Sequence, residues 1–450
     1  MSTLQLPKNL GDNLILRWAT PADNEQLLEL TFHALDEGEE EYPFVKIFVQ
    51  DWIDGKFPIL KHEAMTVVED TNTSKLVSSM CLFSSIWRYG ETEFKVGRPE
   101  LVMTHEDYRR RGLISKQFEV IHALSEARGE VMQVITGIPS LYRAFDYELC
   151  LELGGGYRIY PPSFPKLKGD LADDYRLREP VSDADRAFIK DLHKTNTRAM
   201  LFSMDVPDPI WDFEFGGYTD GSDGKFHWLV IENKAGEPLG YLHHDHVFWG
   251  PVMDINFLAL KPGVGYLNLL PHLLHGLWNI AQRKFVDDNI NHPAEEIRGL
   301  YLRLGRDHPL YDAIGRDLML KAPAYAWYTR FLDETAYLNA IKPQLEKHVA
   351  ESTAGAGFTG ELKLNFYNRG THLKFQEGRL EIESWLPPNG SAGHAHFPAN
   401  SFWSVMCGQK KASQLAIEIA DCWMSRTAQV LLDCIFPEFN GQVWVMGGGG

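Results

Sequence analysis

A weak internal repeat is the feature that most constrains the fold of this 450-residue chain. Residues 14–30 read LILRWATPADNEQLLEL, and residues 175–192 read YRLREPVSDADRAFIKDL. Each copy predicts a short strand that ends in Leu-Arg, then a polar turn and an amphipathic helix. Thr20 in the first copy, and Ser182 or Asp183 in the second, are the expected helix N-caps. The repeat therefore predicts two similar α/β units in tandem.

Further strands follow in both copies. Residues 64–69 and 228–232 each precede a polar turn that leads to another strand, at residues 76–83 and 239–244. The period of about 160 residues is far too long for a solenoid of small repeats. Two fused α/β domains account for the pattern more simply.

The remainder of the chain predicts a third unit of a different kind. Residues 160–174 form a linker rich in proline and charge, and residues 324–349 predict a helical stretch. After a glycine-rich joint come short strands at 361–366, 372–376, 379–382 and 395–398, then helices near 401–406 and 411–425. We expect an α/β (α+β) multidomain protein divided into residues 1–168, 169–322 and 323–450.

Charge, cysteine content and hydropathy exclude several classes of protein. The formal net charge of −17 disfavours nucleic-acid binding and favours cationic ligands. The sequence predicts neither a membrane-spanning helix nor a signal peptide, so we expect no membrane partner. Five scattered cysteines without a C-x-x-C pair indicate reduced thiols in the cytoplasm. The histidines at 243–246 and 394–396 lack a third ligand, so no metal site is expected.

The sharpest local signal is the segment LVMTHEDYRRRGLISKQFEVIHAL, residues 101–124. An apolar strand leads through a turn into Arg109-Arg110-Arg111-Gly112, where a helix begins. Glycine allows a ligand to approach the backbone, and the free N–H groups of a helix N-terminus favour anions. Three arginines add charge-assisted hydrogen bonds. The segment predicts a site for a phosphate-bearing ligand, although a solvated basic turn remains the alternative.

The spacing Arg-x-x-Gly-x-Ile at residues 109–114 resembles the pyrophosphate loop of the GNAT superfamily of acetyl-CoA-dependent acyltransferases. Ile114 stands where that loop usually has a small residue. With this residue and the run Arg-Arg-Arg-Gly-Leu before it, the loop resembles that of the enhanced intracellular survival (Eis)-like family. The segments PANSFWSVMCG and LLDCIFPEF resemble parts of the third domain of that family. The resemblance implies two tandem GNAT-like mixed-sheet domains, 1–168 and a degenerate 169–322, then a sterol carrier protein-like domain, 323–450.

The resemblance also implies roles for individual residues. Tyr142, in GIPSLYRAFDY, matches the general acid that protonates the departing thiolate of CoA. The chain's terminal carboxylate, on Gly450, would enter the active site, or the working end lies nearer Met446 if the four final glycines are not native. Residues implied to bind acetyl-CoA are Val102, Thr104, Arg109, Arg110, Gly112 and Leu113. Arg111 is expected to be structural or to face solvent.

The surroundings of this implied site carry two further expectations. The second repeat lacks an arginine loop after its strand at 257–260, so it should not bind cofactor, and residues 301–315 should shape the acceptor cavity of the first domain. The acidic run at residues 36–41 either is a solvated loop or attracts polycationic amines. Nearby Tyr42, Phe44 and Trp52 would then add cation–π contacts.

Taken together, the chain is expected to be an acetyl-CoA-dependent N-acetyltransferase that acts on a small-molecule cationic amine. In the expected reaction, the amine attacks the thioester directly. The resemblance implies an aminoglycoside-like polyamine, while a lysine amine remains open. It also implies a homo-oligomer, hexameric in the family. The alternative is a non-enzymatic binding protein whose C-terminal domain holds a lipid or another apolar ligand.

Overall fold

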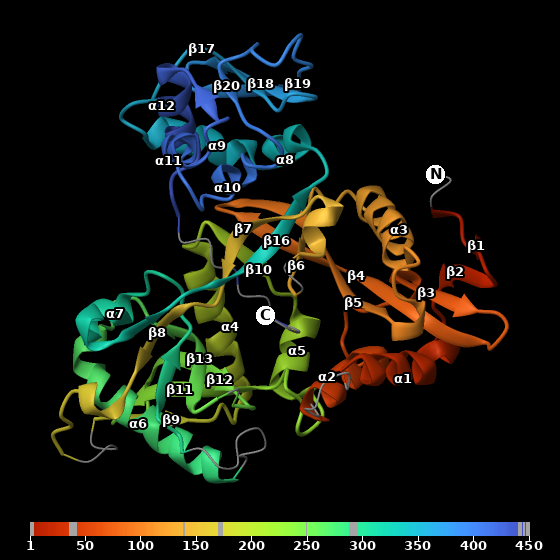
Figure 1. Ribbon diagram of the computed structural model, residues 1–450. Coiled ribbons are helices and arrows are strands. Elements are labelled where there is room, and N and C mark those ends of the chain that lie inside the picture. The colour runs from red at the N-terminus through yellow and green to blue at the C-terminus, as the bar shows by residue number, and fades with distance from the viewer. Residues whose placement is uncertain are drawn as a thin grey trace.

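The computed structural model describes residues 4–35, 43–137, 140–169, 174–248, 250–287 and 296–439, together with Val443 and Met446. Its strands form three sheets, of nine, seven and five strands. The mixed sheets and the helices that cover them confirm the predicted multidomain α+β fold (Figure 1). Among the described helices, none combines the length and apolar character needed to cross a bilayer.

Sheet one has the strand order β1-β2-β3-β4-β5-β6-β16-β7, and β10 pairs with the far end of β4. Helix α3 covers one of its faces, while α1 and α2 cover the other (Figure 1). Its elements are β1 (Lys8–Gly11), β2 (Leu14–Trp18), α1 (Asn24–Leu35), α2 (Pro43–Ile53), β3 (Met65–Asp70), β4 (Lys75–Tyr89), β5 (Thr92–Thr104), α3 (Leu113–Ala127), β6 (Met132–Ile135), β7 (Glu148–Leu153), β10 (Phe202–Asp205) and β16 (Tyr325–Phe331).

Sheet two repeats this plan in the order β15-β8-β14-β13-β12-β11-β9. Helices α4 and α5 lie between the two sheets, and α6 covers the outer face (Figure 1). Its elements are β8 (Gly156–Ile159), β9 (Tyr175–Arg178), α4 (Asp183–Arg198), α5 (Asp208–Gly216), β11 (Phe226–Asn233), β12 (Pro238–Asp245), β13 (Val252–Leu260), α6 (Tyr266–Asp287), β14 (Gly299–Leu302), α7 (Pro309–Ile314) and β15 (Leu320–Ala322).

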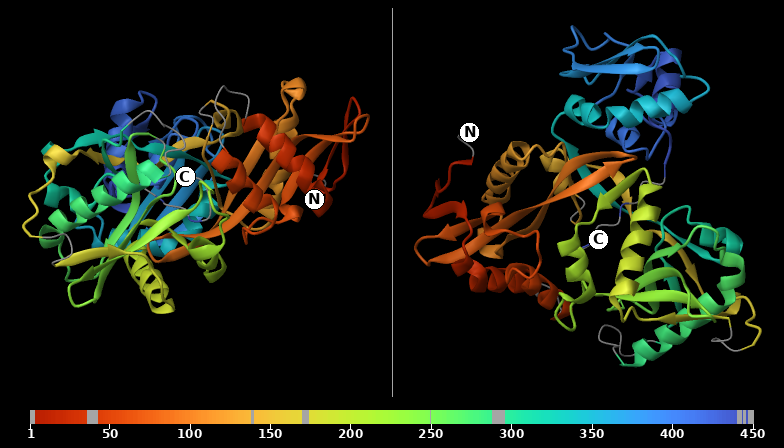
Figure 2. Two further views of the ribbon diagram at one scale, coloured as in Figure 1. Left: turned by 90° about the horizontal axis from the view of Figure 1, so that it is seen from below. Right: turned by 180° about the vertical axis from the view of Figure 1, so that it is seen from behind.

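Sheet three, of order β19-β18-β17-β20-β21, lies with its helices at one end of the molecule (Figure 2). Helix α10 of this unit packs on β7 of sheet one. Its elements are α8 (Glu334–Ala340), α9 (Lys342–Glu351), β17 (Gly360–Asn365), β18 (Gly370–Gln376), β19 (Arg379–Ser384), β20 (Ala395–His396), α10 (Trp403–Met406), α11 (Ala412–Glu418), β21 (Trp423–Met424) and α12 (Arg426–Ile435).

The predicted helix over residues 324–349 is wrong in its first part. Residues 325–331 form β16, which lies between β6 and β7 in sheet one, and the helices begin only at Glu334. The run YAWYTRF is rich in aromatic residues, and its buried Trp327 and Tyr328 suit a strand with a neighbour on each side. The partners of this strand lie some 180 residues away in the sequence, so no local pattern reveals them.

Besides β10, two further strands cross between sheets one and two. Strand β8 follows β7 directly but lies in sheet two, between β14 and β15, whereas β16 returns from β15 into sheet one. The two connections touch at a glycine triplet, because a Cβ on Gly155 would lie 2.7 Å from the Cα of Ala324. A Cβ on Gly156 would lie 2.1 Å from the carbonyl oxygen of Leu302. These glycines therefore permit two chain segments to cross in contact.

The sequence repeat corresponds to a repeated ion-pair network. Arg17 binds both carboxylate oxygens of Asp23, at 2.7 and 2.9 Å, and its Nε donates to Glu69 on β3. Arg178 binds Asp185 with the same two distances, and its Nε donates to Glu232. Each aspartate also closes the capping box of the following helix, with Thr20 or Ser182 at the N-cap. The network fixes β2 to the helical turn that leads into α1, and β9 to α4.

Asp23→Asn and Asp185→Asn should each lower the melting temperature at pH 7, by an amount equivalent to about 1–3 kcal/mol. The hydrogen bonds from Arg17 hold the pKa of Asp23 at about 2, below its ordinary value, and Arg178 lowers the pKa of Asp185 likewise. A lowered folded pKa stabilises above the ordinary pKa and loses that effect as pH falls through the folded value. The difference from wild type should therefore shrink below about pH 4. Asp183→Asn, at an exposed position, is the control, and equal effects of all three changes would contradict the assignment.

Candidate active site

The candidate site lies where β5 and β6 separate. These strands run parallel, but only Val96–Met132 and Gly97–Gln133 are paired. Beyond them β5 continues to Thr104 with an irregularity in its pairing with β4, and Leu101 adopts a left-handed conformation with φ of 51°. Such a bulge bends a strand away from its neighbour. The result is a gap in sheet one, bordered by the second half of β5 and the chain that follows β6.

The arginine loop closes one end of this gap, at the start of α3. Gly112 is the N-cap residue, with φ of 74°, and a Cβ built on it would meet nothing within 4 Å. Arg110 is also left-handed, with φ of 64°. Leu113 begins the helix and is buried. The first backbone N–H groups of α3 have no partners within the helix and lie beside an open glycine, as an anion-binding turn requires.

The three arginines of the loop differ in their contacts. Arg109 and Arg110 are exposed, and the Nε of Arg109 donates to the carbonyl of Thr104, 3.3 Å away. Arg111 donates to the carbonyl of Asp107, and its guanidinium lies 4.8 Å from the centre of the Tyr108 ring. Arg111 thus braces the loop itself.

The end of β5 presents its backbone to the gap. Val102 and Thr104 are partly exposed, and Ser78 on β4 holds this stretch with hydrogen bonds to the carbonyl of Met103 and the hydroxyl of Thr104, at 2.7 and 2.8 Å. Among the described residues, no strand pairs with the other edge of β5 beyond Gly97. Its unpaired backbone groups are available to an extended ligand.

Tyr142 faces β5 from across the gap. It begins a short 3₁₀ helix, Tyr142–Phe145, and is buried with its ring against Phe118 and Tyr328. Its hydroxyl lies beside Gly137, since a Cβ there would approach the oxygen to 3.3 Å. Burial raises the pKa of Tyr142, and the charge of Glu100 raises it further. The phenol is therefore protonated at neutral pH and can donate a proton.

Glu100 is a candidate that the sequence analysis missed. It lies on β5 opposite Cys81, with its carboxylate 3.4 Å from the Nε of Arg98, whose guanidinium stacks over Phe83. Burial raises the pKa of Glu100 to about 7, although Arg98 opposes the shift. A carboxylate with this pKa suits a general base near neutral pH. The predicted strand begins at Leu101 and therefore leaves out Glu100, although a carboxylate within the strand before the arginine loop is a signal in the sequence.

Aromatic and acidic side chains from two parts of the chain gather beside Glu100. Trp52 on α2, Phe83 on β4 and Tyr218 after α5 belong to one buried cluster. The Tyr218 hydroxyl donates to the carboxylate of Glu214 at 3.1 Å. The second repeat therefore covers this face of sheet one with α5 and the turn that follows it, rather than with residues 301–315.

Several expected contributors to the site fall outside the described residues. Gly450 and the acidic run at residues 36–41, with Tyr42, are among them. Phe44 and Trp52 are buried in α2. Met446, the last described residue, is buried in the core, and Val443 accepts a hydrogen bond from the indole of Trp327 on β16. The chain thus reaches sheet one, on the strand next to β6, shortly before its end.

The histidines near residue 244 form a stack. His227 lies between His244 and His246, and the ammonium group of Lys284 is 2.7 Å from its Nε2. Within the described ranges, no group of three His, Cys, Asp or Glu side chains is arranged to hold a metal ion.

Residues 16–150 match the family model described as an acetyltransferase (GNAT) domain. This range contains the gap, the arginine loop and Tyr142. No curated protein sequence matches the chain. The chain carries a GNAT acetyltransferase domain, so it is an acetyltransferase with acetyl-CoA as cosubstrate.

Similar solved structures extend over the whole chain. A GCN5-related N-acetyltransferase from Anabaena variabilis ATCC 29413 is 14% identical, covering 96% of this chain and 99% of that one, with a TM-score of 0.65. A probable N-acyltransferase from Enterococcus faecalis V583 is 12% identical, with the same coverage and a TM-score of 0.67. Eis1 from Mycobacterium abscessus is 12% identical, covering 97% and 100%, with a TM-score of 0.59. At these identities the likeness concerns the fold.

Proposed function

We propose that this acetyltransferase moves an acetyl group from acetyl-CoA to the nitrogen of a cationic amine, either an aminoglycoside-like polyamine or a lysine amine. The observation that carries the proposal is the pairing of a buried phenol, Tyr142, with a carboxylate of raised pKa, Glu100, across the β5–β6 gap. One group can donate a proton and the other can accept one. Direct transfer of an acyl group between sulfur and nitrogen requires both.

One proton donor and one proton acceptor account for both proton transfers of the proposed reaction. The neutral amine attacks the thioester carbonyl, its nitrogen–carbon bond forms, and the backbone of β5 stabilises the oxyanion of the tetrahedral intermediate. The carbon–sulfur bond then breaks, and Tyr142 gives its proton to the departing thiolate. The amine loses its extra proton to a carboxylate. Holding both reactants in one gap supplies the required proximity.

Acetyl-CoA is assigned to the groove that begins at the arginine loop. Arg109 and Arg110 would pair with the pyrophosphate and the 3′-phosphate, and the N–H groups at Gly112 and Leu113 would bind a phosphate oxygen. The pantetheine arm would pair with the free edge of β5 at Val102 and Thr104. The exposure of the two arginines and the open space at Gly112 support this assignment.

Two carboxylates compete for the role of general base. Glu100 is in place beside the gap, with a pKa of about 7. The terminal carboxylate of Gly450, which the family resemblance implies, is supported by the approach of Val443 to β16. The proposal keeps both carboxylates as candidates for the general base, and an experiment below separates them.

A cation is the acceptor that the charges favour. The chain carries a net charge of −17. Glu100 and Glu214 lie beside the cluster that contains Trp52 and Tyr218, on the face of sheet one where we propose that the acceptor binds. Carboxylates and aromatic faces both attract ammonium groups. The acidic run at residues 36–41 would add to this field.

The finer family assignment is also a proposal. We assign the chain to the Eis-like type, with GNAT-like units at residues 1–168 and 169–322, apart from the exchanged strands β8, β10 and β16, and a sterol carrier protein-like unit at 323–450. The whole-chain likeness to solved structures supports this division. A cytoplasmic homo-oligomer, hexameric by the same resemblance, completes the proposal.

Arg109→Ala and Arg110→Ala should each raise the KM for acetyl-CoA about tenfold or more, because a charge-assisted hydrogen bond contributes about 1.5–3 kcal/mol. Arg283→Ala is the matched control, since Arg283 is an exposed arginine on α6, outside the loop, whose Nε donates to the carbonyl of Asn279. It should leave the KM within about twofold. Steady-state kinetics or calorimetry with acetyl-CoA measures the effect, and equal losses in all three variants would contradict the loop assignment.

Tyr142→Phe should lower kcat by about a hundredfold or more while acetyl-CoA still binds, because only the proton donor is lost. A screen of amine acceptors that detects released CoA identifies the acceptor to use. If polyamines and lysine peptides both fail to release CoA, the proposed acceptor class is wrong. Wild-type turnover by the variant would remove Tyr142 from the mechanism.

The two candidate bases can be separated by Glu100→Gln and by a chain extended by about ten residues beyond Gly450, which moves the terminal carboxylate away. With Glu100 as base, wild-type kcat/KM should fall as pH drops below about 7, because the carboxylate becomes protonated. Glu100→Gln should then lose about a hundredfold in kcat and lack this limb, while the extended chain keeps both. The reverse result would assign the base to the terminal carboxylate.

A further inference from the structure

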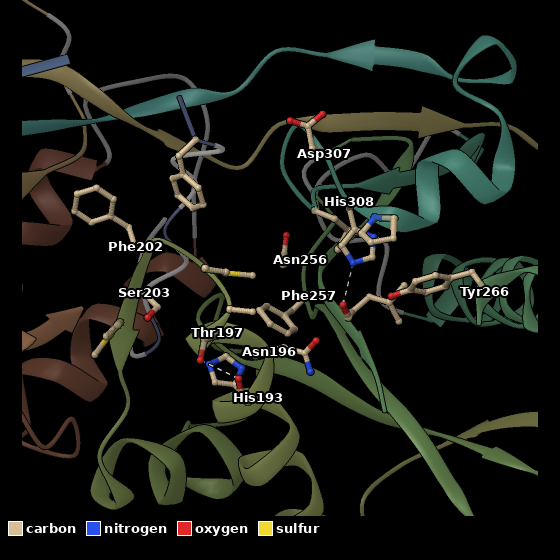
Figure 3. A pocket seen from close by; sticks show the side chains of 17 residues that line it. His193, Asn196, Thr197, Phe202, Ser203, Asn256, Phe257, Tyr266, Asp307 and His308 are labelled. Atoms are coloured by element: carbon tan, nitrogen blue, oxygen red, sulfur yellow. Dashed lines mark hydrogen bonds between the residues drawn. The ribbon is translucent and has the colours of Figure 1, made fainter. Parts of the chain in front are cut away.

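Sheet two contains a second gap of the same construction as the first. Strand β13 pairs in parallel with β14 from Val252 to Ile255, and beyond that point the two strands separate. A cavity of about 300 Å³ lies in the opening (Figure 3). This volume is at the lower end of the range found for small-molecule sites. Because the unit lacks an arginine loop, the cavity calls for a ligand other than acetyl-CoA.

The described walls of the cavity come from six parts of the chain. Helix α4 and the residues after it form one side, and β10, β13, the start of α6 and the loop before α7 form others. Phe439, from the segment after α12, also lines it. Most of the side chains are apolar, and they include Met200, Phe202, Met204, Phe257, Leu304 and Pro309.

The cavity offers little to an anion. Among the described residues that line it, Asp307 is the one acidic side chain, and no lysine or arginine is present. Burial lowers the pKa of His193 to about 3 and that of His308 to about 4, so both imidazoles are neutral. Without a cationic partner, a phosphate or carboxylate ligand would lose its hydration with no compensation.

His308 occupies part of the gap between the separated strands. Its Nε2 lies 3.1 Å from the carbonyl oxygen of Leu258 on β13, and its Nδ1 accepts from the N–H of Leu310 at 3.2 Å. Both ring nitrogens are therefore engaged. The imidazole satisfies a backbone acceptor that would be available to a pantetheine arm in an open groove.

Asn256 supplies a polar group that the protein leaves unused. It is 2% exposed, its Nδ2 donates to Asp245, and no described residue donates to its Oδ1. Figure 3 shows this side chain in the middle of the cavity, between Phe202 and His308. A buried acceptor without a donor destabilises the folded protein, so a ligand with an N–H or O–H group there is favoured.

We propose that this cavity is a binding site for a small, largely apolar, uncharged molecule that donates one hydrogen bond to Asn256 Oδ1. The apolar walls supply the affinity, and Asn256 fixes the orientation. The site is separate from the acetyl-transfer gap and uses none of its residues. It touches sheet one through β10, which pairs with β4.

Indole is a suitable probe, because it is uncharged, aromatic and carries one N–H donor but no reactive amine. Calorimetric titration of the full chain, with acetyl-CoA saturating the first domain, should show one indole bound per chain. 1-Benzothiophene, which replaces the N–H with sulfur, should bind about fivefold more weakly, the loss expected for one hydrogen bond. Indole-3-acetate, an anion, should bind more weakly still. Absence of indole binding, or equal affinity for all three compounds, would overturn the proposal.

Two variants locate the binding. Met200→Trp fills the cavity and should abolish indole binding, while Met319→Trp, a matched change at a partly buried position outside the cavity, should not. Asn256→Ala should bring the affinities for indole and 1-benzothiophene together, a ratio that does not depend on the stability of the variant. Indole binding that survives Met200→Trp, or a preference for indole that survives Asn256→Ala, would place the ligand elsewhere and refute the site.

Discussion

Only two residue pairs join β5 to β6, and that early separation creates the space in which the acetyl-transfer chemistry is proposed. Where a parallel pairing ends inside a protein, backbone groups on both strands need new partners. In sheet one these groups face a gap with the arginine loop at one end and Tyr142 opposite Glu100. In sheet two the corresponding gap holds the ring of His308, which takes up one of the free carbonyls. One fold thus produces two different sites.

The strand exchange fixes the two gaps relative to each other. Strand β16 lies directly beside β6, and β8 lies directly beside β14, so each gap is bordered by a sheet that includes a strand from the other part of the chain. The crossing requires the glycines at 155 and 156, where a side chain would collide with Ala324 or Leu302. A continuous buried core then runs from Trp87 through Phe257 to Trp403. The three units therefore pack as one body.

The charged groups are distributed unevenly over the protein. The arginine loop concentrates positive charge at one helix start within a chain of net charge −17. On the other side of the same gap, burial raises the pKa of Glu100 to about 7. Among the described residues that line the cavity of sheet two, the histidines are neutral and one side chain is a carboxylate. The phosphates, the amine and the uncharged ligand that we propose would therefore bind at different places.

Short-range patterns suffice to predict the repeat of strand, capped helix and paired strands, because Leu-Arg, the capping residues and the alternation of apolar residues act over short distances. The same is true of the arginine loop that we propose binds acetyl-CoA, since its arginines and glycine are adjacent in the chain. The strand at residues 325–331 becomes evident only in the folded protein, since its partners in β6 and β7 lie far away in sequence. The same holds for Glu100, whose raised pKa depends on burial, and for Asn256, whose Oδ1 lacks a donor among the described residues of the assembled cavity.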